Sequence, residues 1–434
     1  MLPVDGPPIE RGGVAVEDGR IVAVGPANEL EGEPETFPES AIVPGLVNAH
    51  SHLEYAVYAG FGDGLADFGD WISLHQERKN RIGWGDYLAI ARWGASECLA
   101  GGVTTVGDAS FSGAAAVAAD ELGLRAIVYL EVFGADPDEA LRRFAELRER
   151  AGDRVGGRIT IGISPHAPYT ISLETYRACA ELGIPVATHI SESRSEVEFL
   201  ETGGGPWAGL IPFLVRAPGK TGTRLLADEG LLGPVLVAAH CTVVDADEIA
   251  LLAEHDVAVV HCPRSNALLG CGFAPLTELR AAGIRVGLGT DSPASTPSFD
   301  MFEEMRTAVY VARGRERNPA AITASDALEL ATLGSARALG LDAEVGSLAP
   351  GKRADLAVVS LSGSPYLPWE DPAAAVVFGG SPERIELTLV DGEERYRRGG
   401  ERWPELRRSA ERARARMLGE ARPDARPPTR ALKS

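Results

Sequence analysis

The sequence predicts an α/β protein, a (β/α)8 (TIM) barrel that carries a small β-sandwich domain built from both termini. Eight short apolar segments alternate with helical segments, and they are apolar on both faces, as strands of a buried parallel sheet are. The eight units occupy about 250 residues, the usual size of such a barrel. A doubly wound sheet is the rival, but no Gly-rich phosphate loop follows the first strand. The predicted strands lie within residues 41–52, 102–110, 125–133, 159–168, 185–193, 234–241, 257–266 and 285–293.

Helical segments separate these strands, among them residues 87–100, 138–151 and 245–255. The first of the three runs into Gly101, which is typical of a helix C-terminus. Two stretches, near the two ends of the chain, do not follow this alternation of strands and helices. They contain short predicted strands and turn sequences such as Asp18-Gly19. We therefore expect a composite β domain from residues 1–44 and 346–400, and a barrel from 45–345.

The last residues, 401–434, carry ten Lys/Arg against five Asp/Glu. They predict a short amphipathic helix and a frayed end. The segment is interpreted as a solvated tail in preference to a partner contact.

Composition excludes several classes of protein. The chain has 434 residues, 45% of them hydrophobic, and a formal net charge of −20, so it is neither disordered nor suited to nucleic acid or an acidic membrane. Its five cysteines form no CxxC pair, which indicates a reducing compartment. Neither a signal peptide nor an 18-residue apolar run is visible, so we expect a cytoplasmic protein without a membrane span.

Polar residues occur at the carboxyl ends of four predicted strands. His50 and His52 alternate at the end of the first strand, His189 ends the fifth, His240 the sixth and Asp291 the eighth. Each alone is an ordinary core histidine or helix cap. Because the carboxyl ends of barrel strands meet at one rim, the set together predicts a metal centre.

These segments also carry a resemblance to a known family. The stretches PGLVNAHSHLE, THISES, AAHC, HCPRSN and LGTDSP, with GSLAPGKRADLAVV in the predicted β domain, resemble the amidohydrolase superfamily, specifically its mononuclear deaminase/chlorohydrolase branch. The resemblance covers about residues 9–395. It implies that His50, His52, His189 and Asp291 bind metal, and that His240 lies beside the attacking water.

The number of metal ions follows from the lysines. Binuclear members of the superfamily bridge two ions with a carboxylated lysine at a strand end. The chain has only Lys79, Lys220, Lys352 and Lys433, and none ends a predicted strand. We therefore expect one divalent ion. Zn²⁺ suits three imidazoles and a carboxylate, and Fe²⁺ fits the same ligands.

The pattern HISE places Glu192 three residues after His189, as in the deaminase branch. Hydrolysis of an aminopurine requires protonation of the ring nitrogen beside the attacked carbon, and a carboxyl group can deliver that proton. Asp291 would accept the proton of the water. The alternative for Glu192 is a solvent-facing or capping glutamate.

Four further residues are candidate substrate contacts. His166 lies in a PHxPY segment that in similar deaminases contacts the ribose or tail of the substrate, and Arg264 follows the seventh strand. Trp71 is one aromatic residue of the long first loop that could stack on a base. Glu54 lies two residues after His52 and could point into the pocket or cap the next segment.

The segment HCPRSNALLGCG, with LGTDSPAS, looks most like aminodeoxyfutalosine deaminases. The resemblance implies a purine nucleoside substrate, foremost 6-amino-6-deoxyfutalosine of menaquinone biosynthesis, with release of ammonia. 5′-Methylthioadenosine, S-adenosylhomocysteine and adenosine are rival substrates. The alternative functions are a chlorohydrolase, a cyclic amidohydrolase and a scaffold protein without metal. The resemblance is also compatible with a homodimer.

Overall fold

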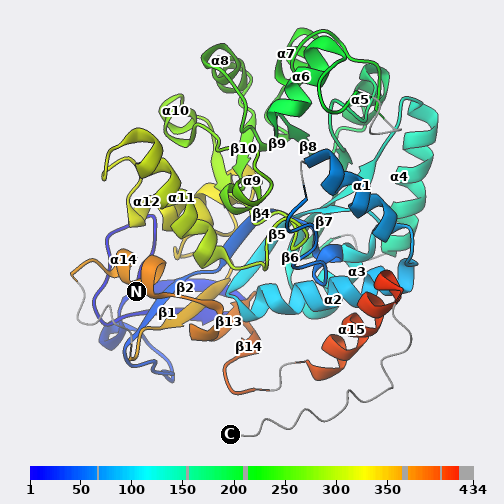
Figure 1. The fold of residues 1–434 in the computed structure, drawn as a ribbon. Helices are drawn as coiled ribbons and strands as arrows, with labels where there is room; N and C mark the ends of the chain where they lie inside the picture. Colours follow the sequence, from blue (N-terminus) through cyan, green and yellow to red (C-terminus); the bar gives the residue numbers. More distant parts are fainter. Residues whose placement is uncertain (66–67, 153–155, 209–213, 364–369, 401–402, 420–434) are drawn as a thin grey trace, which may run out of the picture.

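The computed structural model describes residues 1–65, 68–152, 156–208, 214–363, 370–400 and 403–419. Eight parallel strands lie side by side in sequence order, with helices between them, and form a nearly closed barrel, as predicted (Figure 1). The last strand returns to the first, where the amide of Asp291 donates to the carbonyl of His50 at 2.9 Å. The strands are β4 (Leu46–Ser51), β5 (Val103–Ser110), β6 (Arg125–Val132), β7 (Ile159–Pro165), β8 (Val186–Ile190), β9 (Leu236–His240), β10 (Ala258–His261) and β11 (Val286–Leu288).

Helices cover the outside of the barrel, and their ends carry the expected signals. In α4 the Asp136 side chain accepts hydrogen bonds from the amides of Asp138 and Glu139, and Pro137 occupies the first turn. No described helix combines the length and the apolar character needed to cross a bilayer. The helices from α2 to α13 are α2 (Trp84–Ala100), α3 (Ala114–Leu122), α4 (Pro137–Ala151), α5 (Leu173–Ala180), α6 (Arg194–Thr202), α7 (Gly222–Asp228), α8 (Ala246–Glu254), α9 (Pro263–Leu268), α10 (Leu276–Ala281), α11 (Met301–Glu316), α12 (Ala324–Glu329) and α13 (Ser335–Ala338).

The long connection between the first two barrel strands is itself folded. A 3-10 turn η2 (Leu53–Tyr55) follows β4 directly, and helix α1 (Phe68–Lys79) precedes α2. Side chains of α1 line the same pocket as the strand-end histidines. The connection therefore forms one wall of the site, as long loops at the carboxyl ends of barrel strands commonly do.

Two antiparallel sheets pack beside the barrel and draw strands from both ends of the chain (Figure 1). β1 (Gly12–Glu17) and β2 (Arg20–Pro26) form a hairpin at Asp18-Gly19, as predicted. The larger sheet has the order β14-β13-β12-β3. Its strands are β3 (Ser40–Pro44), β12 (Leu356–Ser360), β13 (Ile385–Val390) and β14 (Glu393–Arg397), and helix α14 (Pro372–Gly379) precedes β13.

The segment predicted as one strand, residues 41–52, is two strands in the structure. It divides at Gly45, where β3 leaves the small sheet and β4 enters the barrel. A Cβ at Gly45 would lie 2.1 Å from the Thr104 hydroxyl, so the crossing of the two sheets leaves no room for a side chain. We keep the division into a composite domain (1–44 and 346–400) and a barrel (45–345) as a proposal.

The predicted C-terminal helix is present as α15 (Pro404–Leu418), and it packs on α2 (Figure 1). Ala410, Ala413 and Met417 are buried, and the guanidinium of Arg416 donates to Asp86 at 2.8 Å. The interpretation of this segment as a solvated tail is therefore wrong for α15, because the small alanine face fits closely against α2. Residues 420–434 lie outside the described part of the chain.

Candidate metal centre

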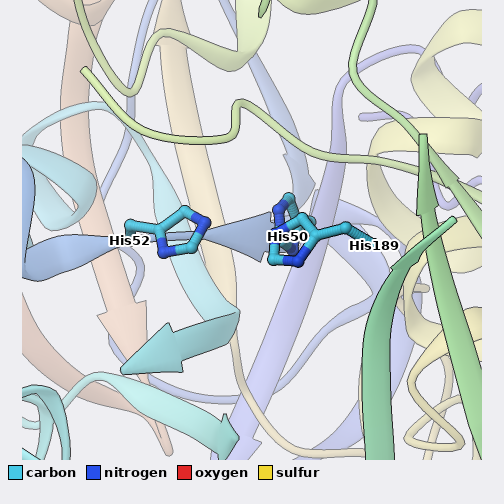
Figure 2. A group of neighbouring side chains, drawn as sticks. All are labelled: His50, His52 and His189. Carbon is cyan, nitrogen blue, oxygen red and sulfur yellow. The ribbon is translucent and has the colours of Figure 1, made fainter. Parts of the chain in front are cut away.

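Three histidines converge at the carboxyl end of the barrel. His50 lies in β4 and His52 directly follows its last residue, so the alternation of side chains sends both in the same direction, and His189 comes from β8. One ring nitrogen of each lies within 4.8 Å of those of the other two (Figure 2). The Nδ1 of His189 lies 2.7 Å from the carbonyl of His166, which leaves Nε2 of His189 for the group.

Asp291 completes this group from the end of the eighth strand. Its Oδ1 lies 3.6 Å from Nε2 of His50 and 3.3 Å from Nε2 of His52. Its Oδ2 accepts hydrogen bonds from Ser265 at 2.6 Å and Ser295 at 2.7 Å. Burial alone would raise the pKa of Asp291, but the imidazoles of His50 and His52 hold it well below its usual value. The carboxylate is thus fixed and ionised, with one oxygen turned to the histidines.

Glu192 and His240 lie on the other side of Asp291, and the three side chains form a second buried group. Oε1 of Glu192 is 3.7 Å from Nε2 of His240. Burial raises the pKa of Glu192 well above its usual value, and the charges of Asp291 and Glu196 raise it further. The raised pKa favours the protonated form of this carboxyl group, the form that a proton donor needs.

The loop that presents Glu192 is held by Glu196. The carboxylate of Glu196 accepts hydrogen bonds from the amides of Ser191, at 2.9 Å, and Glu192, at 2.7 Å. On the other side, the amide nitrogen of Asn266 lies 3.1 Å from Nδ1 of His240. Neither partner was predicted to have this role, although both lie in quoted motifs or directly after them.

The backbone is strained at this rim. Ser191, His240 and Asp291 have φ angles of +51°, +74° and +57°, a region that residues other than glycine rarely adopt. Each stands at or just after the carboxyl end of a barrel strand. Strain of this kind persists where surrounding contacts fix it, and it concentrates at functional sites. Here it occurs at the ends of β8, β9 and β11, the strands that present Glu192, His240 and Asp291.

The donors present fit one divalent cation. Nε2 of His50 is buried without a hydrogen-bond partner among the described residues, and a bound cation would satisfy it. Three imidazoles and one carboxylate are the donor set that Zn²⁺ and Fe²⁺ accept. His50, His52, His189 and Asp291 are therefore the residues that would hold the ion.

A pocket opens from this centre. Of the predicted substrate contacts, His166 and Trp71 line it. The Nδ1 of His166 lies 2.9 Å from the Thr170 hydroxyl, so Nε2 of His166 is free for the pocket. The Trp71 ring stacks on His75, and its indole nitrogen donates to the carbonyl of Ala294 at 3.2 Å.

Two predicted contacts do not reach the pocket. The carboxylate of Glu54 accepts hydrogen bonds from the amides of Ser112, at 2.9 Å, and Ala115, at 3.2 Å, at the start of α3. The guanidinium of Arg264 donates to the carbonyl of Asp300 at 3.0 Å and lies 3.2 Å from Glu303. Neither residue lines the pocket. Both predictions are corrected, because these side chains support neighbouring helices.

Sequence reasoning missed several polar residues that line the pocket, among them Glu131, His75 and Lys79. Glu131 lies near the end of β6, and the rule that identified the histidines would have found it. One oxygen of Glu131 and one nitrogen each of His166 and His189 lie within 4.8 Å of one another. His75 and Lys79 come from α1, and the sequence gives no signal that they face the pocket.

This geometry agrees with the relationships of the chain. Residues 41–395 match the amidohydrolase family, and residues 12–32 match an imidazolonepropionase-like composite domain of bacteria. The chain belongs to the amidohydrolase family, and it is a hydrolase that acts on carbon–nitrogen bonds.

Its relatives include several nucleoside deaminases. It is 38% identical to a 5-methylthioadenosine/S-adenosylhomocysteine deaminase of Symbiobacterium thermophilum, with 88% of each chain covered. It is 34% identical to a 5'-deoxyadenosine deaminase of Methanothermobacter thermautotrophicus, with 88% of this chain and 89% of the relative covered.

Solved structures give the same fold. An adenosine deaminase of Xanthomonas campestris with bound zinc superposes with a TM-score of 0.86 at 29% identity, and 96% of each chain is covered. A zinc-bound atrazine chlorohydrolase of Arthrobacter aurescens gives a TM-score of 0.79 at 24% identity, covering 93% of this chain and 94% of the other, which shows the fold alone.

Proposed function

We propose that this hydrolase deaminates a 6-aminopurine nucleoside whose 5′ position is modified. The observation that carries the proposal is the position of Glu192. A buried carboxyl group with a raised pKa lies beside His240 and Asp291 and lines the same pocket as His52 and His189. Ring protonation is needed for an aminated heterocycle, and this carboxyl group can supply it.

His50, His52, His189 and Asp291 would hold the cation, for which we propose Zn²⁺, with Fe²⁺ as the alternative. A bound divalent cation would supply Lewis-acid chemistry, lowering the pKa of a water molecule to about 7 so that hydroxide is available at neutral pH. The zinc in the Xanthomonas campestris structure supports this choice.

The side chains then have separate tasks. Glu192 delivers its proton to the purine nitrogen beside C6, which makes C6 electrophilic. Asp291 takes the proton of the attacking water, and His240 lies where Nε2 can hydrogen-bond the incoming oxygen. The C6–O bond forms, Asp291 passes the proton that it took to the amino group, and the C6–N bond breaks with release of ammonia. The C6 hydroxyl proton returns to Glu192 as the 6-oxo product forms. Trp71 and His166 line the wall against which the base and sugar would lie.

The relatives favour a modified 5′ position. The curated relatives above act on 5-methylthioadenosine, S-adenosylhomocysteine and 5'-deoxyadenosine, all of which differ from adenosine at that carbon. The more specific prediction, 6-amino-6-deoxyfutalosine of menaquinone biosynthesis, is also a 6-aminopurine nucleoside. It differs from the relatives' substrates in the group at the 5′ end of the ribose.

An ammonia-release panel tests the proposal. The metal-loaded protein is assayed with 5′-methylthioadenosine, S-adenosylhomocysteine, 5′-deoxyadenosine, 6-amino-6-deoxyfutalosine and adenosine, with atrazine as a non-nucleoside control. We expect ammonia from the 5′-modified nucleosides at a kcat/KM above that for adenosine, and no chloride from atrazine. Metal analysis of the same sample should give one ion per chain. A metal-loaded protein that deaminates none of the nucleosides would contradict the proposal.

A further inference from the structure

The wall of the pocket formed by α1 carries a lysine that the reaction above does not use. Lys79 lies in the last turn of α1, is only 5% exposed, and lines the pocket that contains the histidines. Among the residues that the structure describes, no carboxylate oxygen lies within 4.0 Å of its Nζ. An ammonium group this deeply buried is normally paired.

Aromatic rings surround this ammonium group. Nζ of Lys79 lies 3.7 Å from the centroid of Phe111, 5.5 Å from that of Phe133 and 5.7 Å from that of Tyr55. Ring faces attract a cation and so offset part of the cost of burial, but they do not neutralise its charge. Burial lowers the pKa of Lys79 to about 8, with the charge of Glu131 opposing this shift, so the ammonium form still prevails at pH 7.

Lys79 lines the same pocket as His52, His189 and Asp291, with aromatic rings between the ammonium group and these side chains. The ring of His189 is 4.8 Å from that of His166, and His166 is 4.9 Å from Phe133, the ring that Lys79 approaches. A second route runs through Tyr55, whose ring stacks on His52 at 5.5 Å and lies 5.7 Å from Nζ of Lys79. A nucleoside with its base at Glu192 would extend its sugar and 5′ group along this wall. Glu131 lies nearer the histidines, within 4.8 Å of His166 and His189.

We propose that Lys79 is a specificity-determining residue that binds a carboxylate at the end of the 5′ substituent. The inference rests on the proposed function and narrows it to nucleosides with an anionic 5′ group. S-Adenosylhomocysteine and 6-amino-6-deoxyfutalosine share that chemistry on different carbon frameworks, whereas 5′-methylthioadenosine and 5′-deoxyadenosine lack it. The pairing would give the buried ammonium a direct ion-pair partner, because Glu131 and Glu54 act on its charge only from beyond 4.0 Å.

Size-matched substrates test the inference on the unmodified enzyme. S-Adenosylhomocysteine is compared with its primary carboxamide, which keeps the shape and removes the negative charge. We expect kcat/KM to fall at least tenfold for the carboxamide. The same comparison of 6-amino-6-deoxyfutalosine with its carboxamide shows which of the two carbon frameworks, this one or that of S-adenosylhomocysteine, places its carboxylate at Lys79. Equal values for acid and amide within both pairs would overturn the inference, while deamination of either pair keeps the proposed function.

Variants assign the effect to Lys79. In Lys79→Met the acid-to-amide ratio of kcat/KM should approach one, and in Lys79→Arg, which keeps the charge, it should stay within about threefold of the parent. The matched control is Lys220→Met, because Lys220 is surface-exposed and paired with Asp228 at 2.6 Å. If folded Lys79→Met keeps the parent ratio, Lys79 only packs against the rings. If no nucleoside is deaminated by the parent enzyme, the proposed function itself fails.

Discussion

Glu192 differs from an ordinary loop glutamate in its surroundings. It is buried, its carboxyl group faces His240, and the amide of its own backbone is held by Glu196. These contacts fix the carboxyl group beside the histidines but do not make it one of the four residues that would hold the ion. Its removal should therefore separate chemistry from metal binding.

We expect Glu192→Gln to retain metal and lose turnover. The amide is nearly isosteric but has no acidic proton, so kcat should fall about 10²–10⁴-fold, the usual contribution of a general acid. Metal content by elemental analysis should stay at the parent level. Glu198→Gln is the matched control, because Glu198 lies exposed on the following helix α6. Full activity in Glu192→Gln would remove this residue from the mechanism.

At the scale of single residues, strand alternation predicts side-chain directions in the strand and at the one residue after it, but not farther along the chain. His50 and His52 obey the alternation of β4, and the structure brings them together with His189 and Asp291. Glu54 was placed by the same alternation, but β4 ends at Ser51 and Glu54 lies in the 3-10 turn η2. Lys79 could not be found at all, because it depends on how α1 folds back over the barrel.

At the scale of elements, the centre depends on contact between the two strands that close the barrel. The side chain of Asn48 donates to the Thr290 hydroxyl at 2.7 Å and accepts from the Thr290 amide at 2.9 Å. Gly289, the residue before Thr290, packs against the first strand. A Cβ at Gly289 would lie 2.8 Å from the backbone nitrogen and from the Cβ of His50. This approach brings Asp291 to the first-strand histidines.

Gly289→Ala should weaken metal binding without unfolding the barrel. The added methyl group forces β11 away from His50, and Asp291 moves with it. We expect at least a tenfold loss of zinc affinity, measured by competition with a chromogenic chelator. Gly314→Ala in α11 is the control, because nothing lies within 4 Å of its added Cβ. Parent affinity in Gly289→Ala would show that the metal site does not depend on this close approach.

The eight strands were predictable because buried parallel strands are continuous apolar runs whatever their neighbours are. The break at Gly45 was not, because β3 and β4 are joined by one residue and are equally apolar. Arg264 was misplaced because the end of a strand could not be located to within a residue or two. It was expected at the rim, but β10 ends at His261 and Arg264 already belongs to α9, so its side chain follows the helix.

At the scale of the whole molecule, a charged network joins the barrel to the small sheets. Arg125, at the start of β6, lies 2.9 Å from Asp355 and 2.7 Å from Asp391. Asp391 also lies 3.3 Å from Arg158 and 3.4 Å from Arg353. Burial alone would raise the pKa of Asp391, but these arginines hold it below its usual value.

The depressed pKa predicts an acid-sensitive contribution to stability. A carboxylate whose pKa is lowered by folding stabilises the native state above its unfolded pKa, about 4, and the contribution is lost as the pH falls through the lower folded value. Asp391→Asn should therefore reduce the free energy of unfolding by about 1–3 kcal/mol at pH 7. The difference from the parent should shrink near pH 3, as measured by urea titration at both values. A difference that does not change with pH would exclude ionisation of Asp391 as its source.

The four-stranded sheet takes β3 from residues 40–44 and its other strands from beyond residue 355. During synthesis β3 emerges early and must wait for β12, its pairing partner, until most of the polypeptide has left the ribosome. Every barrel strand is translated within that interval. The small sheet can thus be completed only after all the barrel strands have been made, and nascent chains stalled before β12 would expose an unpaired strand edge to chaperones or to one another.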